Sequence, residues 1–164
     1  MLKKLVPSMT VDSIHDIPLA QLWDKGVRGI IADLDNTLVG AKEPLATPDV
    51  VRWLERVRKN GFRLVIVSNN TKIRVSQFAN PIVVPFIHSA HKPSSKAFRK
   101  AMDIMQLEPG QTAVVGDQLL TDVLGGNRLG LFTVLVQPIS PKDEGVFTKL
   151  NRKIERLVRR MQRG

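Results

Sequence analysis

The stretch Ile30-Ile31-Ala32-Asp33-Leu34-Asp35-Asn36-Thr37-Leu38 joins an apolar run to two carboxylates and a threonine. Its length, its β-branched residues and the preceding Gly29 predict a buried strand that ends near Leu34. Asp33 and Asp35 are two positions apart, so their side chains point the same way while the backbone stays extended. Two carboxylates in one space repel each other, and Mg²⁺ would offset that repulsion because it binds carboxylates together with phosphate oxygens. The stretch therefore predicts a magnesium and phosphate site at a strand end, with solvated acids as the alternative.

The composition indicates one folded domain. The 164 residues have room for a single domain with a sizeable core, which we expect to span residues 1–164. The chain has no cysteine, which excludes disulfide frameworks, thiolate catalysis and cysteine zinc sites. No apolar run approaches the roughly 20 residues that cross a bilayer, and Pro7, Thr10 and Asp12 interrupt any signal-peptide core. We expect a cytoplasmic protein, at most peripheral to the inner face of the membrane.

Strand and helix patterns alternate along the chain. Strands are expected at about 29–34, 62–67, 82–87, 111–115 and 131–136, and helices at about 48–60, 73–79, 95–106 and 120–129. Residues 5–21 are an irregular lead-in, with a short helix near Pro18–Trp23. This alternation is typical of an α/β fold whose parallel sheet is covered by helices on both faces. In such sheets, ligands bind beyond the carboxyl ends of the strands.

Polar residues gather where three of the expected strands end. These residues are Asp33, Asp35, Thr37, Ser68, Asn69, Asp117 and Asp122. A loop at His91-Lys92-Pro93 adds a cation, since proline disfavours helical angles at Lys92. Because parallel strands end at the same edge of a sheet, the clusters are expected to converge on one crevice.

This inventory suits phosphoryl transfer through an aspartyl-phosphate. Asp33 is expected to be the nucleophile and Asp35 the acid that protonates the leaving oxygen and then the base that activates water. Metal ligands are expected to be Asp33, Asp35 and Asp117. Phosphate-binding groups are expected to be Thr37, Ser68, Asn69 and Lys92, with Lys92 acting as a point charge. Asp122 is expected to support Asp117 and Lys92 from behind.

The same motifs resemble the haloacid dehalogenase (HAD) superfamily. Asp33-x-Asp35-x-Thr37, Ser68, Lys92-Pro93 and Gly116-Asp117-x4-Asp122 are similar, in this order, to its four motifs. The resemblance implies a Rossmann-like, doubly wound parallel sheet in the order 5-4-1-2-3. It also implies Mg²⁺ as cofactor, phosphoaspartyl chemistry at Asp33, and acid/base work for Asp35, whose backbone carbonyl would bind the metal. Aspartate as nucleophile with a second aspartate two residues on is the phosphatase pattern of that superfamily.

Short intervals between the motifs indicate a subfamily. Neither the segment 38–46 nor the segment 69–91 has room for a separate cap domain, so the chain resembles the cap-less IIIA branch. Asp-Asn-Thr-Leu at 35–38, Ser-Asn-Asn at 68–70 and the segment 121–130 resemble its YqeG-type members, which are similar to mitochondrial phosphatidylglycerophosphate phosphatases. This kinship implies a lipid phosphate substrate. An open site fits a large or surface-presented substrate; another small or macromolecular phosphate ester is the alternative.

The carboxyl-terminal segment carries most of the excess positive charge. The net charge is +10, and seven basic residues lie between Lys149 and Gly164 against one acid, Glu155. Apolar residues recur there at helical spacing, so a basic amphipathic helix is expected at about 146–162. The apolar stripe comprises Leu150, Ile154, Leu157, Val158 and Met161. Such a helix packs its stripe on the core or lies on an anionic membrane surface. Nucleic-acid binding is less favoured because no aromatics are interleaved.

Other function classes are less favoured than a phosphatase. A non-enzymatic RNA-binding or scaffold protein that uses the basic tail is the second hypothesis, and it predicts that Asp33→Asn leaves function intact. A receiver domain is disfavoured because no aspartate follows the strand at 82–87, and no glycine-rich nucleotide motif is present. Lys72 and Arg74 could meet substrate charge, but a solvated surface is the simpler expectation. The sequence does not indicate an oligomeric state.

Overall fold

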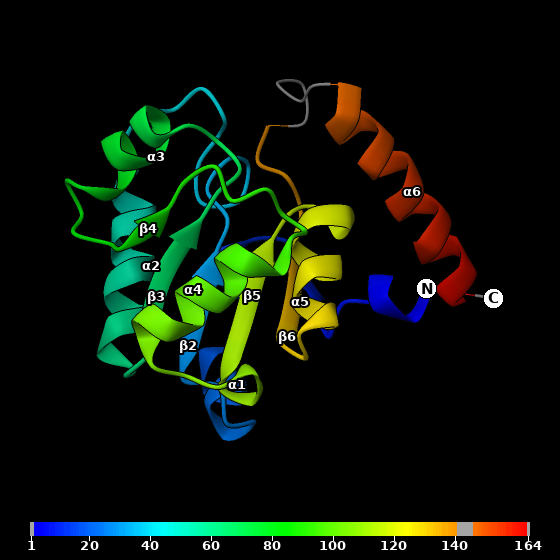
Figure 1. Cartoon of the computed structure of the whole chain (residues 1–164), viewed down its shortest axis with the longest axis horizontal. Coiled ribbons are helices and arrows are strands. Elements are labelled where there is room, and N and C mark those ends of the chain that lie inside the picture. Colours follow the sequence, from blue (N-terminus) through cyan, green and yellow to red (C-terminus); the bar gives the residue numbers. More distant parts are fainter. Residues whose placement is uncertain (1, 141–145, 164) are drawn as a thin grey trace.

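A six-stranded, all-parallel sheet forms the centre of the molecule (Figure 1). The computed structural model describes residues 2–140 and 146–163, with the side chains of residues 3–140, 152–154, 156–161 and 163. The strands are β1 (Met9–Val11), β2 (Gly29–Ala32), β3 (Arg63–Val67), β4 (Phe86–Ile87), β5 (Thr112–Gly116) and β6 (Phe132–Val136). They lie in the order β1-β6-β5-β2-β3-β4.

The expected sheet order is confirmed. The sequence pattern predicted five strands, of which β2 is the first. If these five are numbered 1 to 5 along the chain, their order in the sheet is 5-4-1-2-3, and β1 adds a sixth strand beside β6. The lead-in was expected to be irregular, and β1 escaped the pattern because three residues are too few to show alternation. The strand expected at 82–87 is shorter, because Val83 takes a φ of 55° in the turn that precedes β4.

Helices flank the sheet and connect its strands. The α-helices are α1 (Leu19–Asp24), α2 (Pro48–Lys59), α3 (Lys72–Ala79), α4 (Ser95–Met105), α5 (Leu124–Arg128) and α6 (Val146–Arg163). Short 3₁₀ turns are η1 (Leu2–Leu5), η2 (Ile14–Asp16) and η3 (Pro109–Gln111), and η4 (Leu119–Val123) is a π-helical turn. The expected start of α2 is correct: the Thr47 hydroxyl accepts a hydrogen bond from the Val50 amide at 3.3 Å. The helix expected at 120–129 is divided between η4 and α5.

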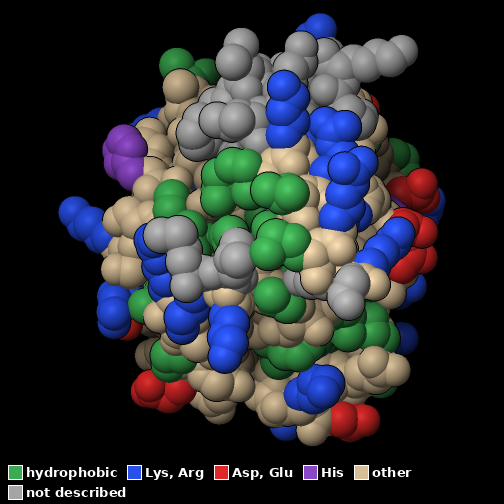
Figure 2. Space-filling model, turned by 90° about the vertical axis from the view of Figure 1, so that its right-hand side faces the viewer, with side chains coloured by type: hydrophobic (Ala, Val, Ile, Leu, Met, Phe, Trp, Pro, Cys, Tyr) green, Lys and Arg blue, Asp and Glu red, His purple; other side chains and the backbone are tan. Residues whose placement is uncertain are grey.

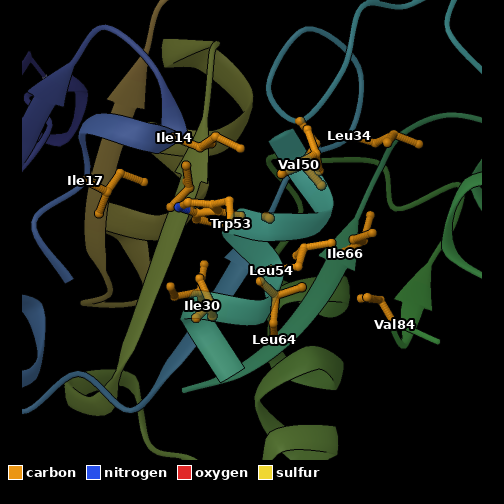
Figure 3. Close-up of a cluster of buried hydrophobic side chains, with 14 of the residues drawn as sticks. Ile14, Ile17, Ile30, Leu34, Val50, Trp53, Leu54, Leu64, Ile66 and Val84 are labelled. Atoms are coloured by element: carbon orange, nitrogen blue, oxygen red, sulfur yellow. The ribbon is translucent and has the colours of Figure 1, made fainter. Parts of the chain in front are cut away.

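Alternate residues of the strands face two hydrophobic layers. Ile30 and Ile66 pack with α1, α2 and α3, where Trp53 lies at the centre of the cluster (Figure 3). Ile31 and Val65 point the other way and pack against α4. This alternation makes each strand apolar on both faces, as the continuous apolar runs of the sequence predict.

The two intervals in which a cap would be inserted contain no separate domain. Between β2 and α2 the chain forms a loop with bends and turns, and between β3 and Lys92 it forms only α3 and β4. The carboxyl ends of the strands are therefore left without a lid built from these two insertions.

Helix α6 lies at the edge of the molecule beside the amino-terminal turn η1 (Figure 1). Val158 is buried with Leu5, Leu119 and Leu135, and Ile154 packs partly against the same cluster. Leu157 and Met161 are 59% and 55% exposed, so the apolar stripe is split between the core and the outer surface. The side chain of Leu150 lies outside the described residues. None of the described helices is both long and apolar enough to cross a bilayer.

Candidate active site

The carboxyl ends of β2 and β5 bring Asp33 and Asp117 together. These strands are neighbours with Ala32 opposite Val115, and the Asp33 amide donates to the Val115 carbonyl at 2.9 Å. Asp122 from η4 completes a group in which one carboxylate oxygen of each residue lies within 4.8 Å of the others. All three residues are buried. The predicted convergence of Asp33, Asp117 and Asp122 is therefore what the fold produces.

Lys92 lies between two of these carboxylates. Its ammonium donates to Asp33 Oδ1 at 3.0 Å and to Asp122 Oδ1 at 2.7 Å. Burial would lower the pKa of Lys92, but the charges of Asp122 and Asp33 outweigh it and raise the pKa above its ordinary value. Asn69 fixes the loop, since its Oδ1 accepts from the Lys92 amide at 2.7 Å. In this structure the Asn69 side chain thus positions Lys92.

Asp117 is held from two directions. Thr37 donates its hydroxyl proton to Asp117 Oδ1 at 3.1 Å. Arg152, from α6, donates to Asp117 Oδ2 at 2.5 Å and also to the Asp117 backbone carbonyl. Burial and the neighbouring Asp33 and Asp122 raise the pKa of Asp117 well above its ordinary value, although Arg152 opposes the shift. Arg152 was not predicted, because nothing local separates it from the other basic residues of the tail.

Asp122 is packed close to the backbone of β5. A Cβ added to Gly116 would lie 2.1 Å from the Asp122 carboxyl carbon, so only glycine permits this approach. Within the described residues, Oδ2 of Asp122 is buried without a hydrogen-bond partner. Burial, opposed by Lys92 and reinforced by Asp33, raises the pKa of Asp122 to about 6.

These groups fit a divalent cation. Three buried carboxylates meet two described cations, Lys92 and Arg152, which leaves excess negative charge when all of the acids are ionised. Asp122 has a buried oxygen without a hydrogen-bond partner, and the pKa values of Asp117 and Asp122 are raised by burial and by neighbouring carboxylates. A bound cation would relieve both features. Oxygen ligands are those preferred by Mg²⁺.

Asp35 lies in a different environment from Asp33. Its carboxylate accepts from the Arg74 guanidinium at 3.1 and 3.0 Å and from the side-chain amide of Asn70 at 2.9 Å. Strand β2 ends at Ala32, and the turn that follows Asp35 begins at Asn36, which takes a φ of 63°. Asp33 and Asp35 accordingly bind different partners, and Asp35 does not belong to the group of three carboxylates.

Arg74 was expected on a solvated surface, and that expectation is wrong. Its side chain is 13% exposed and forms an ion pair with Asp35. The reason is local: the Thr71 hydroxyl caps α3 by accepting from the Arg74 amide at 3.3 Å, which places Arg74 in the first turn of the helix next to the site. The capping threonine was the sequence signal that could have placed Arg74.

Ser68 follows β3 and is buried. Its hydroxyl accepts from the Asn70 amide at 3.1 Å, while its own amide donates to the Ile87 carbonyl. Ser68 therefore organises the loop that carries Asn69 toward Lys92 and Asn70 toward Asp35. The residues expected to bind phosphate all belong to this sheet edge.

The known proteins whose sequences resemble this chain include several named as phosphatases. A family model described as mitochondrial PGP phosphatase matches residues 2–140. Probable phosphatase YqeG of Bacillus subtilis (strain 168) is 46% identical over 159 residues, which cover 96% of this chain and 92% of that protein. Phosphatidylglycerophosphate phosphatase 1, chloroplastic, of Chlamydomonas reinhardtii is 26% identical over 92% of this chain, which spans 59% of that enzyme.

Solved structures share the fold. An uncharacterized protein from Listeria monocytogenes serotype 4b superposes with a TM-score of 0.58 at 19% identity, covering 73% of this chain and 85% of that one. The cobalt-bound deoxy-D-mannose-octulosonate 8-phosphate phosphatase of Haemophilus influenzae gives a TM-score of 0.53 at 13% identity, covering 80% and 89%. At these identities the likeness concerns the architecture alone.

Proposed function

The chain belongs to the mitochondrial PGP phosphatase family, as a cap-less HAD-type phosphatase, and from this premise we propose that it is a Mg²⁺-dependent phosphomonoester hydrolase that acts on phosphatidylglycerophosphate through a phosphoaspartyl intermediate. The observation that carries the proposal is the meeting of Asp33, Lys92, Asp117 and Asp122 at one sheet edge. The proposed substrate is the one named for relatives such as the Chlamydomonas enzyme.

Asp33 is the proposed nucleophile. A carboxylate oxygen of Asp33 forms a bond to phosphorus while the bond from phosphorus to the substrate oxygen breaks. Asp35 gives a proton to that departing oxygen and then takes one from the water that attacks the phosphoaspartate, which restores Asp33 and releases phosphate. The ion pair with Arg74 holds the Asp35 carboxylate in one orientation, and Asn70 fixes its second oxygen.

Lys92 and Asp122 supply fixed charge beside the nucleophile. Lys92, kept protonated by the two carboxylates, faces the phosphoryl oxygens, where a positive charge lowers the energy of the transferring group. Asp122 holds the ammonium in place. Thr37, Ser68 and Asn69 complete the phosphate-binding set.

Mg²⁺ is the proposed cofactor. The carboxylates of Asp33 and Asp117 and the backbone carbonyl of Asp35 would hold the ion, which would supply neutralising charge for the phosphate and the buried acids.

A lipid surface is the proposed place of action. The side of the molecule that carries α6 shows apolar side chains flanked by Lys and Arg, with Asp and Glu only toward its margins (Figure 2). Leu157 and Met161 are exposed there beside Lys153, Arg156 and Arg160. Apolar residues among basic ones suit the boundary of an anionic bilayer, where each nearby Lys or Arg contributes on the order of 1 kcal/mol. We place the protein in the cytoplasm, at the inner face of the membrane.

Vesicle sedimentation tests this surface separately from catalysis. We expect the full chain to sediment with phosphatidylglycerol vesicles and to stay in solution with phosphatidylcholine vesicles. The Leu157→Ser/Met161→Ser variant should lose this binding, whereas Ile104→Ser, at an exposed apolar residue of α4, should retain it. Equal sedimentation of both variants would remove the membrane surface from the proposal.

A phosphate-release assay tests the activity. With Mg²⁺ present, phosphatidylglycerophosphate is compared with small phosphate esters and with phosphorylated RNA ends, and Asp33→Asn serves as the inactive control. We expect the lipid to be hydrolysed fastest and Asp33→Asn to release no phosphate. Faster turnover of a small ester or of RNA ends would replace the lipid as substrate, and full activity of Asp33→Asn would disprove the mechanism.

A further inference from the structure

Helix α6 sends one arginine into the active site. The Arg152 side chain is 16% exposed, and its guanidinium donates both to Asp117 Oδ2 and to the Asp117 backbone carbonyl. The proposed reaction assigns no task to Arg152, because nucleophile, acid, phosphate-binding groups and metal ligands are all found elsewhere. The contact between Arg152 and Asp117 therefore has no part in the proposed reaction.

Both oxygens of the Asp117 carboxylate already accept hydrogen bonds. Thr37 donates to Oδ1, and Arg152 donates to Oδ2. A carboxylate oxygen can accept more than one partner. A divalent cation bound to Asp117 would nevertheless stand close to the guanidinium, and two positive charges in a buried space repel each other strongly. Arg152 thus neutralises Asp117 in the way that a bound cation would.

The apolar contacts that hold α6 on the body of the molecule are separate from the ion pair between Arg152 and Asp117. Between residues 152 and 163 the helix is anchored to the body through Val158 and partly through Ile154, while Leu157 and Met161 face outward. Arg152 forms an ion pair with Asp117, whereas the other described basic residues of α6 form no ion pair with the three carboxylates. Loss of the Arg152 contact would leave the apolar anchor of the helix in place.

We propose that Arg152 is an autoinhibitory residue that competes with the divalent cation for Asp117, so that docking of this end of α6 and metal binding exclude each other. The inference rests on the cation site of the proposed function. Linkage is reciprocal: whatever weakens the Arg152 contact tightens metal binding, and metal binding loosens α6 by the same factor. The helix that meets the lipid surface would then also govern the metal site.

Isothermal titration of the metal-free full chain with Mg²⁺ tests the competition without measuring activity. Arg152→Ala should bind Mg²⁺ about tenfold more tightly than the wild type. Arg156→Ala removes the same charge from an exposed position one turn later and should leave the affinity unchanged. Asp117→Asn should abolish binding and identifies the site that is titrated.

Hydrogen exchange gives the reciprocal readout. Mg²⁺ should speed exchange of the α6 backbone in the wild type, and Arg152→Ala should show fast exchange at its amino-terminal end without metal. Equal or weaker Mg²⁺ affinity in Arg152→Ala would overturn the competition while leaving the metal site intact, as would equal gains in Arg152→Ala and Arg156→Ala. Absence of Mg²⁺ binding in every protein would overturn the metal site of the proposed function and this inference with it.

Discussion

The two aspartates of the opening stretch occupy contrasting surroundings. Asp33 shares a buried space with Asp117, Asp122 and Lys92, where negative charge exceeds what the ammonium neutralises. Asp35, two residues on, is matched by a single guanidinium, that of Arg74, and by an amide. We name the first group the carboxylate cluster and the second the Arg74 pair. In the proposed mechanism the two environments suit different tasks: the first group would attract a cation, and the second would hold a proton carrier in place.

The largest effect on activity is expected when Asp33 and Asp35 are neutralised one at a time. Asp33→Asn should reduce phosphate release by several orders of magnitude and should form no phosphoenzyme, because a neutral amide replaces the attacking carboxylate. Asp35→Asn should still form phosphoenzyme from an ester with an activated leaving group such as p-nitrophenol, since that oxygen needs no proton. Quenched-flow detection of labelled protein distinguishes the two. Phosphoenzyme in Asp33→Asn would contradict the assignment.

A smaller effect is expected from the supporting acid of the carboxylate cluster. Asp122→Asn removes one of the two charges that hold Lys92, so kcat/KM should fall about 10- to 100-fold. Asp103→Asn, at an exposed acid on α4, is the matched control and should keep full activity. Steady-state phosphate release measures both, and similar rates for the two variants would show that Lys92 needs Asp33 alone.

The Arg74 pair should respond differently from the carboxylate cluster. Arg74→Ala frees the Asp35 carboxylate to rotate, and kcat should fall about tenfold while Mg²⁺ affinity stays unchanged. The loss should shrink for esters with activated leaving groups, a readout that general damage to the fold would not produce. Lys72→Ala, exposed on the same helix, should behave as wild type. If Arg74→Ala also lost Mg²⁺ affinity, the Arg74 pair would not be independent of the carboxylate cluster.

The smallest expected effect concerns stability. In Gly116→Ala the added methyl would meet the Asp122 carboxyl group, so the free energy of unfolding should fall by about 1–3 kcal/mol. Gly110→Ala, where an added Cβ meets nothing within 4 Å, is the control. Urea denaturation compares the two, and equal stability would mean that Asp122 moves aside without cost.

Much of the fold followed from local pattern. Continuous apolar runs predicted the strands that carry the site, and Thr47-Pro48 predicted the start of α2. The failures have physical causes. Strand β1 is three residues long and is too short to show a readable period. Strand β4 occupies only the end of the strand expected at 82–87, because Val83 takes a positive φ in the preceding turn.

The candidate site, like the fold, could be predicted from the sequence only in part. Carboxylates that follow adjacent parallel strands must meet, which is why Asp33 and Asp117 could be paired in advance. Placing Arg74 required recognising Thr71 as the cap that fixes where α3 begins. Arg152 could not be placed, because its position depends on which turn of α6 docks at the crevice. One arginine among many basic residues carries no mark of its contact.

The alternation of strands and helices, the acids at the strand ends and the family likeness were determined by the sequence itself, since apolar period and parallel connection favour this class of fold. The order of the strands was implied by the family likeness, and the structure confirms it. Tertiary structure alone decided which cation faces which acid: Lys92 between Asp33 and Asp122, Arg74 on Asp35, Arg152 on Asp117. Charge pairing depends on distances of a few ångströms between residues far apart in the chain, and no local pattern records those distances.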